Sequence, residues 1–113
     1  MPFDNDLAGR VRKILGWQKN VVEKKMFGGL TFMINGHMAC GIDKDRLMVR
    51  VLPDRYEELL KRHHVKKMDL TGRPLRGFLF IAPQGYEKDS DLQFWLKQAI
   101  EFIQSRPGKA PAS

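Results

Sequence analysis

The dipeptide Asn35-Gly36 lies between two runs of alternating apolar residues. Both central residues of a type I′ turn need a positive φ, which asparagine and glycine adopt readily, so this dipeptide is the strongest short-range signal of a β-hairpin. Residues 43–46 form a polar segment that predicts a second reversal soon afterwards. Residues 26–51 therefore predict three consecutive antiparallel strands.

Helices are predicted on either side of this sheet. Residues 4–15 place apolar side chains on one helical face, and Pro53 begins a second helix that extends to about His63. Residues 90–104 have the broadest apolar face, and two further strands fit residues 65–70 and 77–82. The predicted class is α+β, a two-layer fold with a five-stranded antiparallel sheet and helices packed on it, in the order α-β-β-β-α-β-β-α.

The composition is that of one globular domain. The chain has 113 residues, of which 42% are hydrophobic, and its apolar runs fall well short of the 18 or so residues of a membrane span. We expect a single domain over residues 1–104 and a flexible tail at 105–113, where proline and glycine replace large apolar residues. The N-terminus does not have the pattern of a signal peptide, so we expect a cytoplasmic protein that does not associate with membranes.

Residues that often carry chemistry are few. Cys40 is the only cysteine, and on a regular strand it shares a face with Met38 and Ile42, so we interpret it as a buried apolar residue. His37 lies three residues away, which on an extended strand places it on the opposite face from Cys40. His63 and His64 are adjacent, a spacing that does not suit a shared metal. We expect no enzymatic activity, no cofactor and no metal site.

The glycine pair Gly28-Gly29 interrupts the first predicted strand. Glycines within a strand usually mark a β-bulge, and less often a place where a partner approaches bare backbone. We expect the bulge, and keep the second interpretation open.

Several short motifs together resemble one known family. They are Met26-Phe27-Gly28-Gly29, the Asn35-Gly36 hairpin, the Gly72-Arg73-Pro74 turn, and Phe94-Trp95 in the last helix. With this combination the sequence resembles the N-terminal domain of the TfoX (Sxy) family of bacterial competence regulators, over roughly residues 7–104. The resemblance implies a fold similar to that of type III secretion chaperones, in a bacterial cytoplasmic protein.

The resemblance also implies a function. Family members are associated with the activation of competence genes, apparently together with a cyclic-AMP-responsive transcription factor, and no reaction is attached to this domain. Full-length regulators carry a second, helical C-terminal domain, and the resemblance here is to the first domain only. We therefore expect a small regulatory or interaction module that acts through protein–protein contacts, with a transcription factor or a second copy of the chain as partner.

The expected partner-binding residues come from two of these motifs. A Gly-Arg-Pro turn would hold the arginine side chain on a fixed scaffold, although the same arginine could instead bond loop carbonyls. The five methionines between positions 26 and 68 suit an adaptable binding surface, and they suit a core equally well. The candidate partner-binding residues are Met26, Phe27, Gly28, Gly29 and Arg73.

Nucleic-acid binding is the alternative. The formal net charge is +7, and the densest basic run lies at residues 61–67. These cations could contact phosphates, or they could simply complement the C-terminus of the second helix. Aromatic residues that would stack on bases are not interleaved with the run, which favours the second interpretation. The candidate nucleic-acid residues are Lys61, Arg62, Lys66, Lys67 and Arg76.

Overall fold

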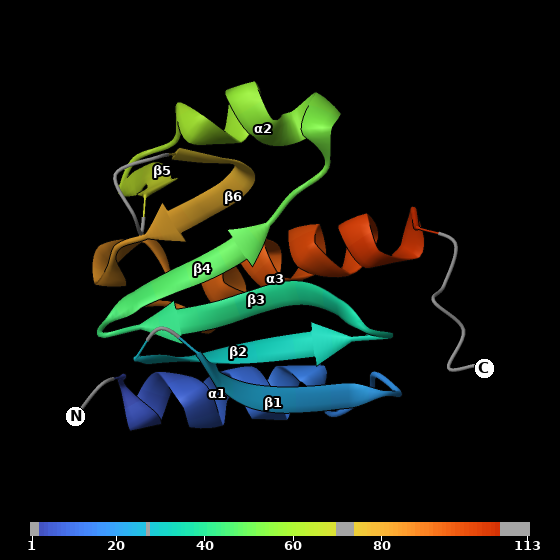
Figure 1. Ribbon diagram of the computed structural model, residues 1–113. Coiled ribbons are helices and arrows are strands. Elements are labelled where there is room, and N and C mark those ends of the chain that lie inside the picture. The colour runs from blue at the N-terminus through green and yellow to red at the C-terminus, as the bar shows by residue number, and fades with distance from the viewer. Residues whose placement is uncertain (1–2, 27, 70–73, 107–113) are drawn as a thin grey trace.

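The computed structural model describes residues 3–26, 28–69 and 74–106, which form an antiparallel sheet and three α-helices (Figure 1). The six strands are arranged in the order β1-β2-β3-β4-β6-β5. In chain order the elements are α1 (Asn5–Leu15), β1 (Val21–Met26), β2 (Gly29–Ile34), β3 (His37–Asp43), β4 (Arg46–Arg50), α2 (Pro53–Leu60), β5 (Val65–Asp69), β6 (Pro74–Ile81), the 3₁₀ turn η1 (Pro83–Gly85) and α3 (Asp89–Gln104). The predicted α+β class is confirmed.

All three described helices pack on one face of the sheet. In Figure 1, α1 and α3 lie behind β1 to β4, and α2 lies beyond β5 and β6. Each helix contributes buried side chains to one main core, including Leu7 from α1, Leu59 from α2 and Leu96 from α3. The facing strand residues include Phe32 and Ile42, which are no more than 1% exposed. The opposite face of β1 to β4 has no described helix in front of it (Figure 1).

Both predicted reversals in the central sheet are confirmed. Asn35 and Gly36 have φ values of 53° and 81°, as a type I′ turn requires. The side-chain amide of Asn20 donates a hydrogen bond of 3.0 Å to the side-chain oxygen of Asn35. This bond connects the turn to the start of β1. Asp43 lies opposite Arg46 in the next hairpin, and their side chains form an ion pair.

The prediction of five strands is wrong, because the segment before Gly28 forms a sixth, β1. This strand pairs with β2 from Val21 opposite Ile34 to Met26 opposite Gly29. Its four central residues are exposed, and three of them, Glu23, Lys24 and Lys25, are charged. An edge strand does not need the alternating apolar pattern of a half-buried strand, so periodicity could not reveal it.

The expected bulge at Gly28-Gly29 is also wrong. Gly28, with a φ of 79°, lies in the connection between β1 and β2, and Gly29 is the first residue of β2. The register shift lies instead between Phe32 and Met33, which pair with Cys40 and Met38. Ala39 is therefore the additional residue on β3.

This bulge changes which β3 side chains share a face. Met38 lies opposite Met33 on the face without helices, whereas Cys40 and Ile42 are buried in the main core. The prediction that Met38 shares a face with Cys40 and Ile42 assumed regular alternation, which an extra residue interrupts.

The second helix is shorter than predicted. It ends at Leu60, with Lys61 as the C-cap residue, so His63 lies outside it in an exposed turn. His64 has a φ of 68°, a left-handed conformation that helical residues do not adopt.

The start of α3 is fixed to the rest of the fold by Arg10 of α1 and by Tyr86, which precedes the helix. Arg10 of α1 donates to the carbonyl oxygens of Tyr86 and Glu87, at 2.9 and 3.1 Å, and forms an ion pair with Asp89. The Tyr86 hydroxyl donates to the carbonyl oxygen of Asp45 at 2.5 Å. Burial first, and the charges of Asp4 and Asp45 next, raise the pKa of Tyr86 to about 12 against the opposing effect of Arg10.

Substitution of Gly29 tests its close contact with β3. A Cβ atom there would lie 2.3 Å from the carbonyl oxygen of Ile42. We expect Gly29→Ala to lower the free energy of unfolding by about 1–3 kcal/mol, because overpacking forces the two strands apart. Chemical denaturation followed by circular dichroism would measure this change.

Gly9→Ala is the matched control for that substitution. Gly9 is exposed within α1, and a Cβ atom there would have no neighbour within 4 Å. Alanine is the better helix former by roughly 1 kcal/mol, so this variant should be more stable than the parent. Equal stability of Gly29→Ala and the parent would contradict the close strand contact.

Candidate partner-binding face

Eight apolar side chains lie on the sheet face opposite the three helices. The strand register aligns them in rows: Val22 lies opposite Met33 and Met33 opposite Met38, while Met48 lies opposite Phe80. We call this surface the methionine face, and its members are Val22, Met26, Met33, Met38, Met48, Met68, Phe78 and Phe80.

The methionine face is buried at one end and open at the other. Met48, Met68 and Phe80 form a small cluster of their own, each no more than 4% exposed. Met38 and Phe78 pack against this cluster while remaining partly exposed. At the β1 end, Val22 is 52% exposed. Apolar surface is therefore accessible at the β1 end of the face, next to the buried cluster of Met48, Met68 and Phe80.

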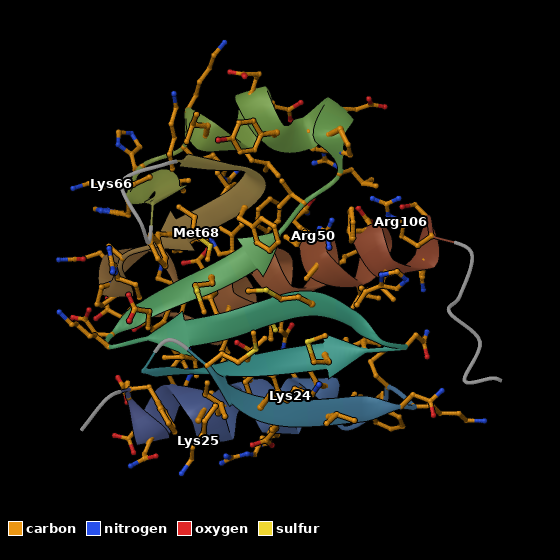
Figure 2. The ribbon with its side chains drawn as sticks, in the orientation of Figure 1. Lys24, Lys25, Arg50, Lys66, Met68 and Arg106 are labelled. Atoms are coloured by element: carbon orange, nitrogen blue, oxygen red, sulfur yellow. The ribbon has the colours of Figure 1, made fainter. Side chains whose placement is uncertain are left out.

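Cations surround this apolar surface. The guanidinium of Arg46 lies 3.9 Å from the ring centroid of Phe80, and that of Arg50 lies 5.1 Å from the ring of Phe78. Cations over aromatic rings are attracted by the ring quadrupole while their polar edges stay available. Lys24 lies beside Thr31 in the register, and Figure 2 labels it on β1.

Lysines also line both edges of the sheet. Lys24 and Lys25 lie on β1, and Lys66 lies on β5 (Figure 2). Lys67 follows on β5, and all four lysines are exposed. Lysine on an edge strand opposes pairing with another strand through charge repulsion and desolvation. The edges are therefore poor docking sites, which leaves the methionine face as the more suitable surface.

The predicted partner-binding residues are only partly within the described structure. Met26, at the end of β1, belongs to the methionine face, and Gly28 and Gly29 lie at the adjoining turn. Phe27 and Arg73 lie outside the described residues. The predicted tail also lies outside them apart from Ser105 and Arg106, whose amides donate to the last turn of α3.

The predicted basic run does not form one surface. Arg62 packs toward α3, with its guanidinium 4.4 Å from the ring of Phe94. Lys66 and Lys67 instead line a cavity of about 440 Å³ beside β5, together with Arg46 and His64. The side chain of Arg76 lies outside the described part of the chain. The run is thus divided by the turn between α2 and β5.

The bulge in β3 also changes the relation of Cys40 to His37. The register places His37 opposite Ile34 and Cys40 opposite Phe32, so both lie on the helix-covered face. The expectation of opposite faces is wrong for this reason. Burial nevertheless raises the pKa of the Cys40 thiol to about 12. A thiol that stays protonated at neutral pH is a poor nucleophile.

Two further findings concern the described residues. Among residues 3–26, 28–69 and 74–106, histidine, cysteine and carboxylate side chains do not gather in groups of three that could hold a metal ion. Within the same residues, none of the helices is long and apolar enough to cross a membrane.

Trp17 is a surface residue with no role predicted from the sequence. It is 90% exposed and lies beside a cavity of about 800 Å³ between α1 and α3, which Ile14 and Gln93 also line. Tryptophan is one of the residue types enriched in binding hot spots, so this groove is a second candidate surface. In the sequence, the position of Trp17 directly after Gly16 indicated that it lies just beyond the end of α1.

The fold and the site define a small α+β domain that buries one sheet face under three helices and exposes a methionine-rich surface on the other. The chain matches the model of the TfoX N-terminal domain family over residues 13–103, and it belongs to that family. Searches of the curated proteins and of the solved structures gave no match. The family supports a regulatory or interaction module in general.

The reactivity of Cys40 tests its burial. We expect the native protein to react with a disulfide reagent at pH 8 no faster than it unfolds, and the denatured chain to react at once. The pKa of this thiol is higher in the folded chain than its ordinary value of about 9. The thiol's contribution to stability is therefore complete below pH 9 and is lost as the pH rises toward about 12.

The matching variant is Cys40→Ala. Its free energy of unfolding should fall less steeply than that of the parent between pH 8 and pH 11. The two slopes can differ by at most about 1.4 kcal/mol per pH unit, because only one titrating group has been removed. Rapid labelling of the native protein would contradict a buried, protonated thiol.

Proposed function

We propose that this protein is a non-enzymatic regulatory module that binds another protein through its methionine face. The observation that carries the proposal is the partly exposed apolar surface formed by Met33, Met38 and Phe78 on the side without helices. Methionine side chains are flexible and polarizable, so they adapt to apolar surfaces of different shapes. The lysine-lined edges direct a partner toward the face rather than toward strand addition.

The family supports a finer version of this proposal. The TfoX family is associated with the activation of competence genes, so we propose a transcription factor as the partner and the bacterial cytoplasm as the place of action. A homodimer formed through the same face is the alternative arrangement, because a two-fold symmetric interface brings the same patch of both copies together and would bury apolar surface on each.

The double variant Met33→Gln, Met38→Gln tests the proposal. Glutamine keeps the length of each side chain and adds polarity to an interface that should exclude water. Both residues are partly exposed, so the fold should tolerate the change with a loss of roughly 1 kcal/mol or less. We expect at least a tenfold weaker affinity for a partner captured by the parent protein, identified by mass spectrometry and verified by titration with the purified partner.

Trp17→Gln is the control, because it removes a large exposed side chain from a different surface. It should bind the partner as the parent does. A partner lost with Trp17→Gln and retained by the methionine variant would move the interface to the groove between α1 and α3. Light scattering that gives a dimer for the parent and a monomer for the methionine variant would favour the homodimer.

Nucleic-acid binding is the second candidate function, and the cavity shared by Arg46, His64, Lys66 and Lys67 is the observation that favours it. Cations from two strands, Arg46 of β4 and Lys66 and Lys67 of β5, gather there next to the ring of Phe80. Such a cluster could hold one or two phosphates of a nucleic-acid backbone.

Fluorescence anisotropy with labelled duplex DNA tests this candidate. The double variant Lys66→Gln, Lys67→Gln should weaken binding and reduce the slope of log affinity against log salt by about one to two. Lys61→Gln is the control, because Lys61 caps α2 and does not line the cavity. Equal losses for the two variants would indicate a general attraction of a basic protein to phosphate.

A further inference from the structure

Arg50 and Arg106 lie at the same end of the sheet, Arg50 at the end of β4 and Arg106 two residues after the end of α3 (Figure 2). Both guanidinium groups pack on one aromatic ring, that of Phe102. The distances to its centroid are 4.2 Å for Arg50 and 5.0 Å for Arg106. Arg50 also lies 5.1 Å from the ring of Phe78 in the methionine face. The pair therefore borders the proposed interface.

The two arginines lack carboxylate partners within the described part of the chain. Arg10, Arg12, Arg46 and Arg55 each form an ion pair with an aspartate or a glutamate. Ion pairs of that kind are not found for Arg50 or Arg106 among residues 3–26, 28–69 and 74–106. Arg62 also has no such ion pair among these residues, so Arg50 and Arg106 are set apart by the packing of both guanidinium groups on one ring.

The arrangement is electrostatically unfavourable without an anion. Arg50 is only partly exposed, and burial first and the charge of Arg106 second lower its pKa. Two like charges in a partly desolvated place repel each other, and an anion between or beside them would reverse that energy.

We propose that Arg50 and Arg106 form a carboxylate-binding site that receives an aspartate or glutamate of a protein partner, next to apolar side chains of the same partner segment on the methionine face. Guanidinium groups bind carboxylates through paired hydrogen bonds, and the net charge of +7 attracts an acidic partner. This inference rests on the proposed function and adds the chemistry of the partner segment.

The site is continuous with the methionine face, which favours a protein segment over a nucleic acid. Arg50 lies directly opposite Phe78 in the strand register, so one short segment can contact both. A nucleic-acid backbone would require cations that continue along a track of phosphates. Among the described residues, the neighbour of Arg50 on the methionine face is the apolar Phe78.

The test uses short labelled peptides in which leucine alternates with glutamate, and a matched set in which glutamine replaces glutamate. We expect the parent protein to bind the glutamate peptide at least tenfold more tightly. Arg50→Gln and Arg106→Gln should each weaken binding of the glutamate peptide about tenfold, as expected for the loss of a charge-assisted hydrogen bond. The double variant should no longer distinguish the two peptides.

Arg12→Gln is the matched control, because it removes the same charge from an arginine that is paired with Glu23 elsewhere. It should bind the glutamate peptide as the parent does. An equal loss with Arg12→Gln would overturn the site in favour of bulk charge, as would parent-like binding by the double variant. Absence of peptide binding by the parent, or arginine dependence seen only with duplex DNA, would overturn it too.

Two further arms separate this inference from the proposed function. The double variant Met33→Gln, Met38→Gln should reduce the affinity for both peptides without removing the preference for glutamate. If the methionine variant binds both peptides as the parent does while the arginine variants lose the preference for glutamate, the result supports the carboxylate site and contradicts the role of the methionine face. The opposite result is a loss of affinity in the methionine variant with an unchanged glutamate preference in the arginine variants. It would support the methionine face and overturn the carboxylate site. Arg106 is exposed, so its variant keeps the test independent of misfolding.

Discussion

The fold depends on the burial of one face of the central strands against three helices. Phe32, Ile42 and Leu47 are at most 1% exposed, and each fully buried side chain of this size contributes roughly 1.5–3 kcal/mol. Because strand side chains alternate between faces, the same strands must present their remaining residues on the other side. Met33, Met38 and Met48 are among those residues, so the requirement that builds the core also creates the candidate interface.

The candidate interface combines apolar contact with unsatisfied charge. Met48, Met68 and Phe80 pack among themselves and give the methionine face a firm base, while Arg46 and Arg50 lie over aromatic rings beside it. A partner that brought only apolar groups would leave the repulsion between Arg50 and Arg106 in place. A partner with a carboxylate would relieve it, which connects affinity to the chemistry of the segment bound.

Much of the fold could be predicted from local patterns. Asn35-Gly36 defined a hairpin because few other residues adopt its dihedral angles, and the apolar spacing of α1 and α3 predicted their buried faces. β1 was missed because exposed Lys24 and Lys25 carry no periodic signal. Met38 was assigned to the wrong face because a bulge at Ala39 has no signature in the sequence. Of the candidate residues that the structure describes, Met26, Gly28 and Gly29 lie at the methionine face or its adjoining turn, and Lys66 lies opposite Phe80 at its border.

The sequence by itself determined the class of fold, the family and the reversals, since these depend on residues close together in the chain. The tertiary structure alone decided which cations share a surface. It separated Arg62 from Lys66 by a turn and brought Arg50 and Arg106 onto one ring, although more than fifty residues lie between them in the sequence. The reason is physical: long-range neighbours are set by how helices pack on a twisted sheet, and local spacing does not record that packing.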